Sequence, residues 1–154
     1  MITILTLGKL KESYWRDAEQ EYLKRISPYA KINFIEIKEE PFRDGDDREK
    51  IKLLEAEKIK KHLPDDGVII ALHEQGKEYD SPGFAKFLES NTTRGEHLVF
   101  IVGGPLGLHK IILSLAQYTL SLSQLTFPHQ MVRTILLEQI YRGITITKGK
   151  QYHY

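Results

Sequence analysis

The sequence contains no cysteine among its 154 residues. Disulfide bonds, thiolate catalysis and cysteine-ligated zinc sites are therefore excluded. The histidines form neither an HxxxH nor an HExxH pair, which argues against a metal site. No apolar run approaches the ~20 residues of a membrane-spanning helix, and the composition, 41% hydrophobic and 28% charged, is that of an ordinary globular protein. We expect a cytoplasmic protein with one domain over residues 1–154, without metal and without a membrane partner.

The chain also lacks an excess of one charge, because 22 lysines and arginines balance 21 aspartates and glutamates. A bulk electrostatic attraction to nucleic acid is therefore not expected. Residues 97–154 nevertheless hold five basic side chains against one acid, Glu138. This local excess indicates either an anion-binding site near the C-terminus or an apolar core flanked by solvated lysines, and the charges alone favour neither.

Segments with the patterns of strands and helices alternate along the chain. The apolar runs at 68–72 and 98–102 are typical of strands covered on both faces. Further strands are expected at 1–7, 31–38 and 119–122. Helical spacing and capping signals predict helices over 13–26, 46–62, 81–90, 108–116 and from 129 to 141 or beyond. Ser81 is the expected cap of the third helix. This order predicts an α/β fold with a mostly parallel sheet flanked by helices.

A glycine-rich segment, FIVGGPLGLH at residues 100–109, joins one of the apolar strands to a helix. Ligands of open α/β sheets bind beyond the carboxyl ends of the strands, and glycine lets the backbone approach a ligand closely. The pattern is GGxxG rather than GxGxxG, so a dinucleotide site is poorly supported. Taken alone, the segment is more typical of a tight turn without a ligand.

A second segment, SLSQLTFPHQMVR at residues 121–133, mixes hydroxyl and amide groups with leucine and phenylalanine. Small-molecule sites have this mixture, although an ordinary loop is the favoured interpretation of these residues alone. The helix that follows is apolar around much of its circumference, so it is either deeply buried or packed against another subunit. Arg133 and Arg142 lie on its opposite faces. His129 is expected to be a packing residue at the helix start.

Five segments together resemble the RlmH family, the bacterial 23S rRNA pseudouridine N3-methyltransferases of the SPOUT class. They are LTLGKLKESYW (5–15), ALHEQGK (71–77), FIVGGPLGLH (100–109), LSLSQLTFPHQMVRTILLEQIYR (120–142) and YH (152–153). Each motif is weak by itself, but their order and spacing cover essentially the whole chain. The resemblance implies a SPOUT fold with a C-terminal trefoil knot, a homodimer, S-adenosylmethionine as methyl donor and 23S rRNA within the ribosome as partner.

The resemblance also implies roles for individual residues. The donor is expected to lie in the knot, against Leu72, Gly103, Leu122, Ser123, Gln124, Leu125, Thr126 and Phe127. The acceptor nitrogen must lose a proton before it attacks, so a base or a cation that stabilises the anion would help. Our hypothesis assigns this assistance to His153 and Arg142, with the tail supplied either by the same subunit or by its partner. Arg133 and Tyr152 are expected to position the RNA.

Other classes of function are compatible with parts of the sequence. A nucleotide-binding oxidoreductase would fit the alternating fold, but the missing GxGxxG motif argues against it. An RNA- or ribosome-binding protein without catalysis, and a SPOUT enzyme acting on tRNA or on a ribose hydroxyl, are the remaining alternatives. A nicotinamide-binding titration tests the oxidoreductase, and binding of S-adenosylmethionine separates the non-catalytic RNA-binding protein from a methyltransferase.

Overall fold

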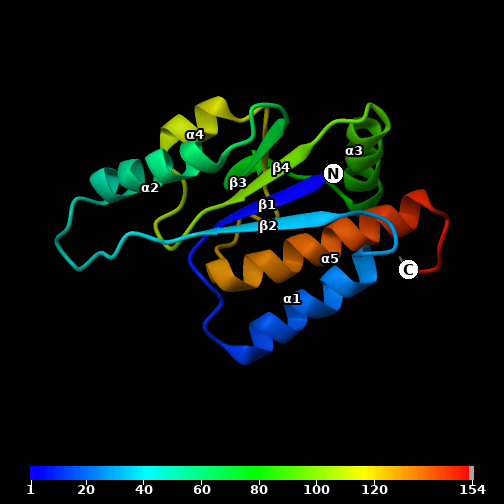
Figure 1. The fold of residues 1–154 in the computed structure, drawn as a ribbon, viewed down its shortest axis with the longest axis horizontal. Helices are drawn as coiled ribbons and strands as arrows, with labels where there is room; N and C mark the ends of the chain where they lie inside the picture. The colour runs from blue at the N-terminus through cyan, green and yellow to red at the C-terminus, as the bar shows by residue number, and fades with distance from the viewer. Residues whose placement is uncertain (153–154) are drawn as a thin grey trace.

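The computed structural model describes residues 1–152 (Figure 1). Its strands and helices alternate along the chain, as the sequence predicts. They are β1 (Ile2–Leu7), α1 (Ser13–Ile26), β2 (Ile32–Ile37), α2 (Arg48–His62), β3 (Val68–Lys77), α3 (Ser81–Thr93), β4 (Leu98–Val102), α4 (Lys110–Leu115), β5 (Tyr118–Leu120) and α5 (His129–Thr147).

The strands form one five-stranded sheet in the order β2-β1-β4-β3-β5, and every pairing is parallel. The predicted α/β class with a mostly parallel sheet is therefore confirmed. The central pairing is long-range, since Ile2 of β1 lies opposite Leu98 of β4. The expected trefoil knot stays a prediction.

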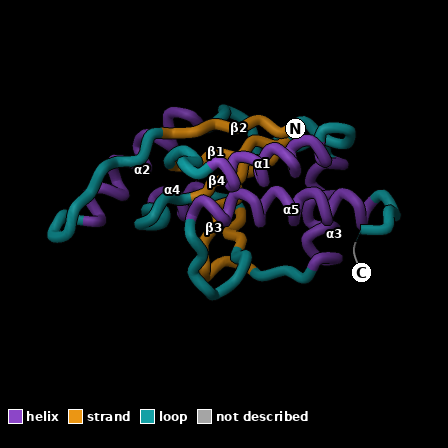
Figure 2. Tube along the Cα trace, turned by 90° about the horizontal axis from the view of Figure 1, so that it is seen from below, coloured by secondary structure: helices purple, strands orange, loops and turns teal. Residues whose placement is uncertain are grey.

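Helices cover both faces of the sheet (Figures 1 and 2). On one face, α1, α3 and α5 pack over Ile4, Ile70 and Phe100. On the other face, α2 and α4 pack over Leu5 and Ile101. Neighbouring residues of β1 and β4 thus point to opposite cores, as side chains of a strand must, and both cores exclude water. This explains why the central strands read as continuous apolar runs.

Helix α5 closes the larger core. Leu136, Leu137 and Ile140 are fully buried within it, and the helix packs against both α1 and α3. The expected apolar helix is therefore deeply buried along one side. Within residues 1–152, no helix is both long and apolar enough to cross a membrane.

Several boundaries differ from the predictions for local reasons. Strand β3 continues past Leu72 to Lys77, because Leu120 of β5 pairs with both of these residues across an irregularity in the register. Gly76 permits this close approach, since a Cβ there would lie 2.8 Å from the carbonyl carbon of Leu120. The cap of α3 is Asp80 rather than Ser81, because the Asp80 carboxylate accepts the Gly83 N–H at 2.8 Å.

Candidate functional site

A cavity of about 590 Å³ opens at the edge of the sheet where β3, β4 and β5 end. The second half of β3, the ends of β4 and β5 with the segments that follow these two strands, and the first turn of α5 form its walls. Ligands of open α/β sheets bind beyond the carboxyl ends of their strands, and this volume suits a molecule of nucleoside size. The cavity is therefore the candidate functional site.

Most of the residues expected to hold a methyl donor meet around this one cavity. The seven that line it are Leu72, Gly103, Leu122, Ser123, Leu125, Thr126 and Phe127. The eighth, Gln124, lines an adjoining cavity of about 650 Å³, which shares Glu74 and Thr126 with the first. Residues more than 50 positions apart along the chain are thus brought to one place by the strand order.

The glycine turn after β4 is both a tight turn and a wall of the cavity. The Gly107 N–H donates to the Gly104 carbonyl at 3.0 Å, and Gly107 has a φ of 75°. A Cβ on Gly103 would lie 3.1 Å from the carbonyl carbon of Gly107. The turn therefore favours glycine at both positions, and the main chain lines the cavity there.

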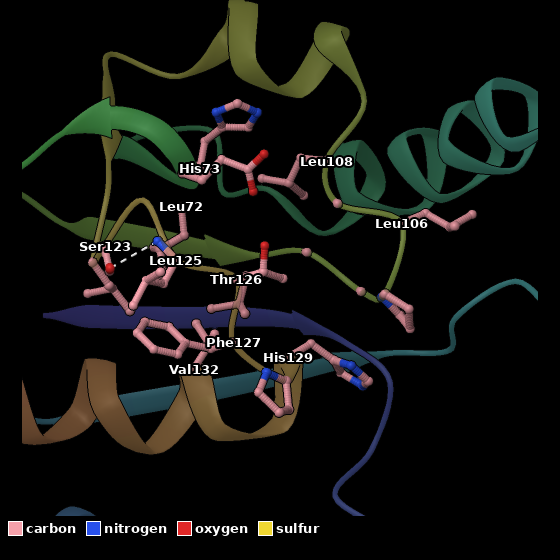
Figure 3. A pocket seen from close by; sticks show the side chains of 18 of the residues that line it. Leu72, His73, Leu106, Leu108, Ser123, Leu125, Thr126, Phe127, His129 and Val132 are labelled. Carbon is pink, nitrogen blue, oxygen red and sulfur yellow. Dashed lines mark hydrogen bonds between the residues drawn. The ribbon is translucent and has the colours of Figure 1, made fainter.

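The loop between β5 and α5 contributes both polar and apolar groups. The Ser123 hydroxyl accepts the Leu125 N–H at 3.0 Å and shapes the loop (Figure 3). Figure 3 shows Leu72, Leu125 and Phe127 on the left of the view, with His129 on the right. Leu125 is 73% exposed, which is unusual for a leucine and leaves its side chain available to cover a ligand.

Sequence reasoning missed several residues of the cavity wall. His73 lines it one position after the apolar run that predicted β3, and His129 and Val132 line it from the first turn of α5. The signal that would have found them is their closeness in sequence to Leu72 and Phe127, which His73 follows by one residue and His129 and Val132 by two and five. Burial lowers the pKa of the His129 imidazole, and the charges of Lys11 and Arg133 act in the same direction against that of Glu39. His129 is therefore a neutral group of the wall at neutral pH.

The expected RNA contact of Arg133 is corrected by the structure. Only 3% of Arg133 is exposed, and its guanidinium is bound from both sides by carboxylates. Nη2 lies 2.7 Å from Glu19 of α1, Nη1 lies 2.8 Å from Glu36 of β2, and the group sits 5.0 Å from the centre of the Phe34 ring. A phosphate has no access to a guanidinium enclosed in this way. Arg133 instead joins α5 to α1 and β2 directly beneath the cavity wall.

Arg142 and Tyr152 lie far from the cavity of their own chain. Arg142 follows His129 by 13 residues of α5, which is about 20 Å at 1.5 Å per residue. Glu138 accepts the Arg142 Nε–H at 3.0 Å, and the guanidinium lies 4.8 Å from the centre of the Tyr152 ring. Burial, followed by a hydrogen bond with Tyr22, raises the pKa of Tyr152 to about 12. His153, the other expected catalytic residue, lies outside the described residues.

Comparison with known proteins agrees with this geometry. The family model described as "Predicted SPOUT methyltransferase" matches residues 1–153. The chain belongs to the SPOUT methyltransferase family. This is the family of RlmH, so the family inferred from the sequence motifs is confirmed. Among solved structures, the chain resembles a probable methylase family protein from Haemophilus influenzae Rd KW20, with a TM-score of 0.59 and 13% sequence identity over 99% of this chain and 70% of that one. At this identity the likeness supports the SPOUT fold.

SPOUT methyltransferases generally use S-adenosylmethionine. The candidate site fits such a donor on three structural grounds: its volume, its backbone-lined glycine turn, and its leucine and phenylalanine walls beside the polar groups of Ser123 and Thr126. No group of three or more acidic or histidine side chains able to hold a metal ion occurs among residues 1–152.

Proposed function

We propose that the protein is an S-adenosylmethionine-dependent methyltransferase that modifies N3 of a pseudouridine in 23S rRNA of the large ribosomal subunit. The observation that carries the proposal is the convergence of seven expected donor-binding residues on one cavity. The family indicates the class of reaction, and the resemblance of the sequence motifs to RlmH indicates which nucleotide is modified. The site of action would be cytoplasmic, on assembled ribosomes.

The cavity residues bind and orient the donor in this proposal. Leu72, Leu122 and Phe127 would enclose the adenosyl group, while the glycine turn brings main-chain amides and carbonyls against it. A bound donor supplies a sulfonium methyl group that is open to in-line displacement. Holding the acceptor nitrogen, the methyl carbon and the sulfur in a row then accounts for much of the rate, because proximity replaces a bimolecular encounter.

The acceptor side requires a group that helps remove the proton of the imide. His153 is our candidate for this step, with Arg142 stabilising the developing negative charge. Arg142 lies about 20 Å along α5 from the cavity of its own chain. We therefore propose a homodimer in which the tail of one subunit serves the cavity of the other.

A truncation that ends at residue 151 tests the division of labour. We expect it to bind S-adenosylmethionine like the full chain, since the cavity is untouched, and to lose methylation of ribosomes. Calorimetry measures the first property and transfer of a radioactive methyl group the second. Full turnover in the truncated protein would remove the tail from the mechanism, and failure of the full chain to bind the donor would contradict the proposed reaction.

The target itself is tested by mass spectrometry of 23S rRNA from cells that lack the protein. We expect the loss of one methyl group from a pseudouridine and its return when the gene is restored. A small protein with a net charge of +1 makes few phosphate contacts of its own. Assembled ribosomes should therefore be better substrates than the isolated hairpin, and equal activity on both would contradict ribosome-dependent recognition.

A further inference from the structure

Cationic and tyrosine side chains gather at the end of the molecule remote from the cavity. They come from the second half of α1, the turn after it, the second half of α5 and the segment that follows α5. We call this cluster the tyrosine–cation surface, and its members are Tyr22, Arg25, Tyr29, Arg142, Lys150 and Tyr152. Along α5, about 20 Å at 1.5 Å per residue separates Arg142 of this surface from the cavity of its own chain.

Each cation of the tyrosine–cation surface lies over a tyrosine ring. Arg25 sits 5.7 Å from the centre of the Tyr22 ring, and Lys150 Nζ sits 4.6 Å from that of Tyr29. Lys150 also donates a hydrogen bond to the Tyr29 hydroxyl. Exposed lysines and arginines are ordinarily mobile, and holding them in place costs side-chain entropy. Here the rings hold the cations in place before any ligand arrives, which lowers the entropic cost of binding an anion.

The surroundings of the tyrosine–cation surface are basic although the whole chain is nearly neutral. Lys24, Lys31 and Lys148 are exposed on the same segments. Among residues 1–152, the acids that pair with this surface are Glu21, which pairs with Arg25, and Glu138, which accepts from Arg142 and Tyr152. Positive charge therefore exceeds negative charge locally, and this is the arrangement that attracts a polyanion at short range.

We propose that the tyrosine–cation surface binds phosphates of the ribosomal RNA that flank the methylated nucleotide. The proposal rests on the proposed function, since an RNA substrate supplies the polyanion. Most contacts between proteins and nucleic acids are made to phosphates, which fix register and orientation without reading sequence. Arg25 and Lys150 thus act as docking residues, whereas the residues of the cavity bind the donor.

A pair of double variants tests the docking role. Arg25→Gln with Lys150→Gln removes two charges from the tyrosine–cation surface. Lys60→Gln with Lys61→Gln removes the same charge from α2 on the opposite face of the sheet, where both lysines are exposed. The control is matched, because Lys60 pairs with Glu57 on its helix as Arg25 pairs with Glu21.

The measurement is the affinity for ribosomes purified from cells that lack the protein, followed from 50 to 200 mM potassium chloride at constant magnesium. Each lost phosphate contact lowers the slope of log affinity against log salt by about 1, so the first double variant should have a slope smaller by about 2. The affinity that this variant loses relative to the wild type at 50 mM potassium chloride should be smaller at 200 mM, by about threefold for each lost contact. The α2 variant should keep the wild-type slope.

Three further measurements keep the result interpretable. Arg25→Lys with Lys150→Arg preserves both charges and should preserve the slope, and thermal melting shows that every variant is folded. Calorimetry with S-adenosylmethionine should give wild-type affinity for all variants, so a defect in the donor site is distinguishable from one in docking. A wild-type salt slope in the Arg25→Gln, Lys150→Gln protein would overturn the proposal.

Discussion

The buried cluster around Arg133 makes a strong prediction about stability. Arg133→Met leaves the Glu19 carboxylate, whose side chain is only 10% exposed, without its cation. The Glu36 side chain, at 34% exposure, can regain water. Removing one partner of a buried ion pair costs about 3–5 kcal/mol. Since Glu36 can be rehydrated, we expect the lower end, about 3 kcal/mol, which lowers the melting temperature by about 6–12 °C in a chain of this size.

The same variant should show a characteristic pH dependence. Burial raises the pKa of the Glu19 carboxyl, and the charge and hydrogen bonds of Arg133 oppose that rise. Without Arg133 the folded-state pKa of Glu19 rises further above its unfolded value. A carboxyl shifted upward loses stability as the pH rises through its folded pKa and regains it below. The defect of Arg133→Met should therefore be smaller at about pH 5 than at about pH 7.5.

Urea denaturation at the two pH values measures both effects. Arg25→Met is the control, because it removes an exposed pair with Glu21, and exposed pairs contribute little to stability. Adding Glu19→Leu to Arg133→Met removes the stranded carboxylate and should recover part of the lost stability. An equal defect at both pH values, or no recovery in the double variant, would refute the account of Arg133 as the partner of a buried charge.

Three other changes have expected outcomes that can be measured directly. Gly76→Ala places a Cβ 2.8 Å from backbone atoms of Thr119 and Leu120, so it should lower the free energy of unfolding by about 2 kcal/mol in urea titrations; an unchanged value would mean that β5 can shift without cost. Asp47→Ala removes the carboxylate that accepts two N–H groups at the start of α2, and should cost about 1 kcal/mol in the same assay. Leu125→Ala should leave stability unchanged, since Leu125 is 73% exposed, but weaken binding of S-adenosylmethionine by about 1 kcal/mol in calorimetry.

The fold was predictable to the extent that local patterns determine it. The apolar runs of β3 and β4 indicated strands covered on both faces, and the predicted start of α2 at residue 46 lies within two residues of the observed start, Arg48. The extension of β3 to Lys77 was not predictable, because it depends on pairing with Leu120 more than 40 residues later. A polar stretch such as HEQG indicates the end of a strand unless the neighbouring strand that pairs with it is known.

The candidate site was less accessible to reasoning from residues alone. Periodicity predicted that Arg133 and Arg142 lie on opposite faces of α5, but it could not show what covers either side chain. Arg133 is enclosed by Glu19 and Glu36, which lie 114 and 97 residues away in sequence. Similarly, β3 and the segments after β4 and β5 meet only because of the strand order. The resemblance to a known family, rather than the local patterns, anticipated that convergence.

The position of α5 has a consequence for how the chain folds during synthesis. Leu136, Leu137 and Ile140 of α5 are fully buried in the larger core. Strand β1 pairs with the distant strand β4 as well as with β2, the next strand in sequence. The N-terminal half therefore cannot reach its final packing when it leaves the ribosome, although domains usually fold as units in the order of synthesis. The apolar surface of the nascent chain therefore stays exposed until its last helix emerges. Non-local pairing of this kind makes the final folding step slow.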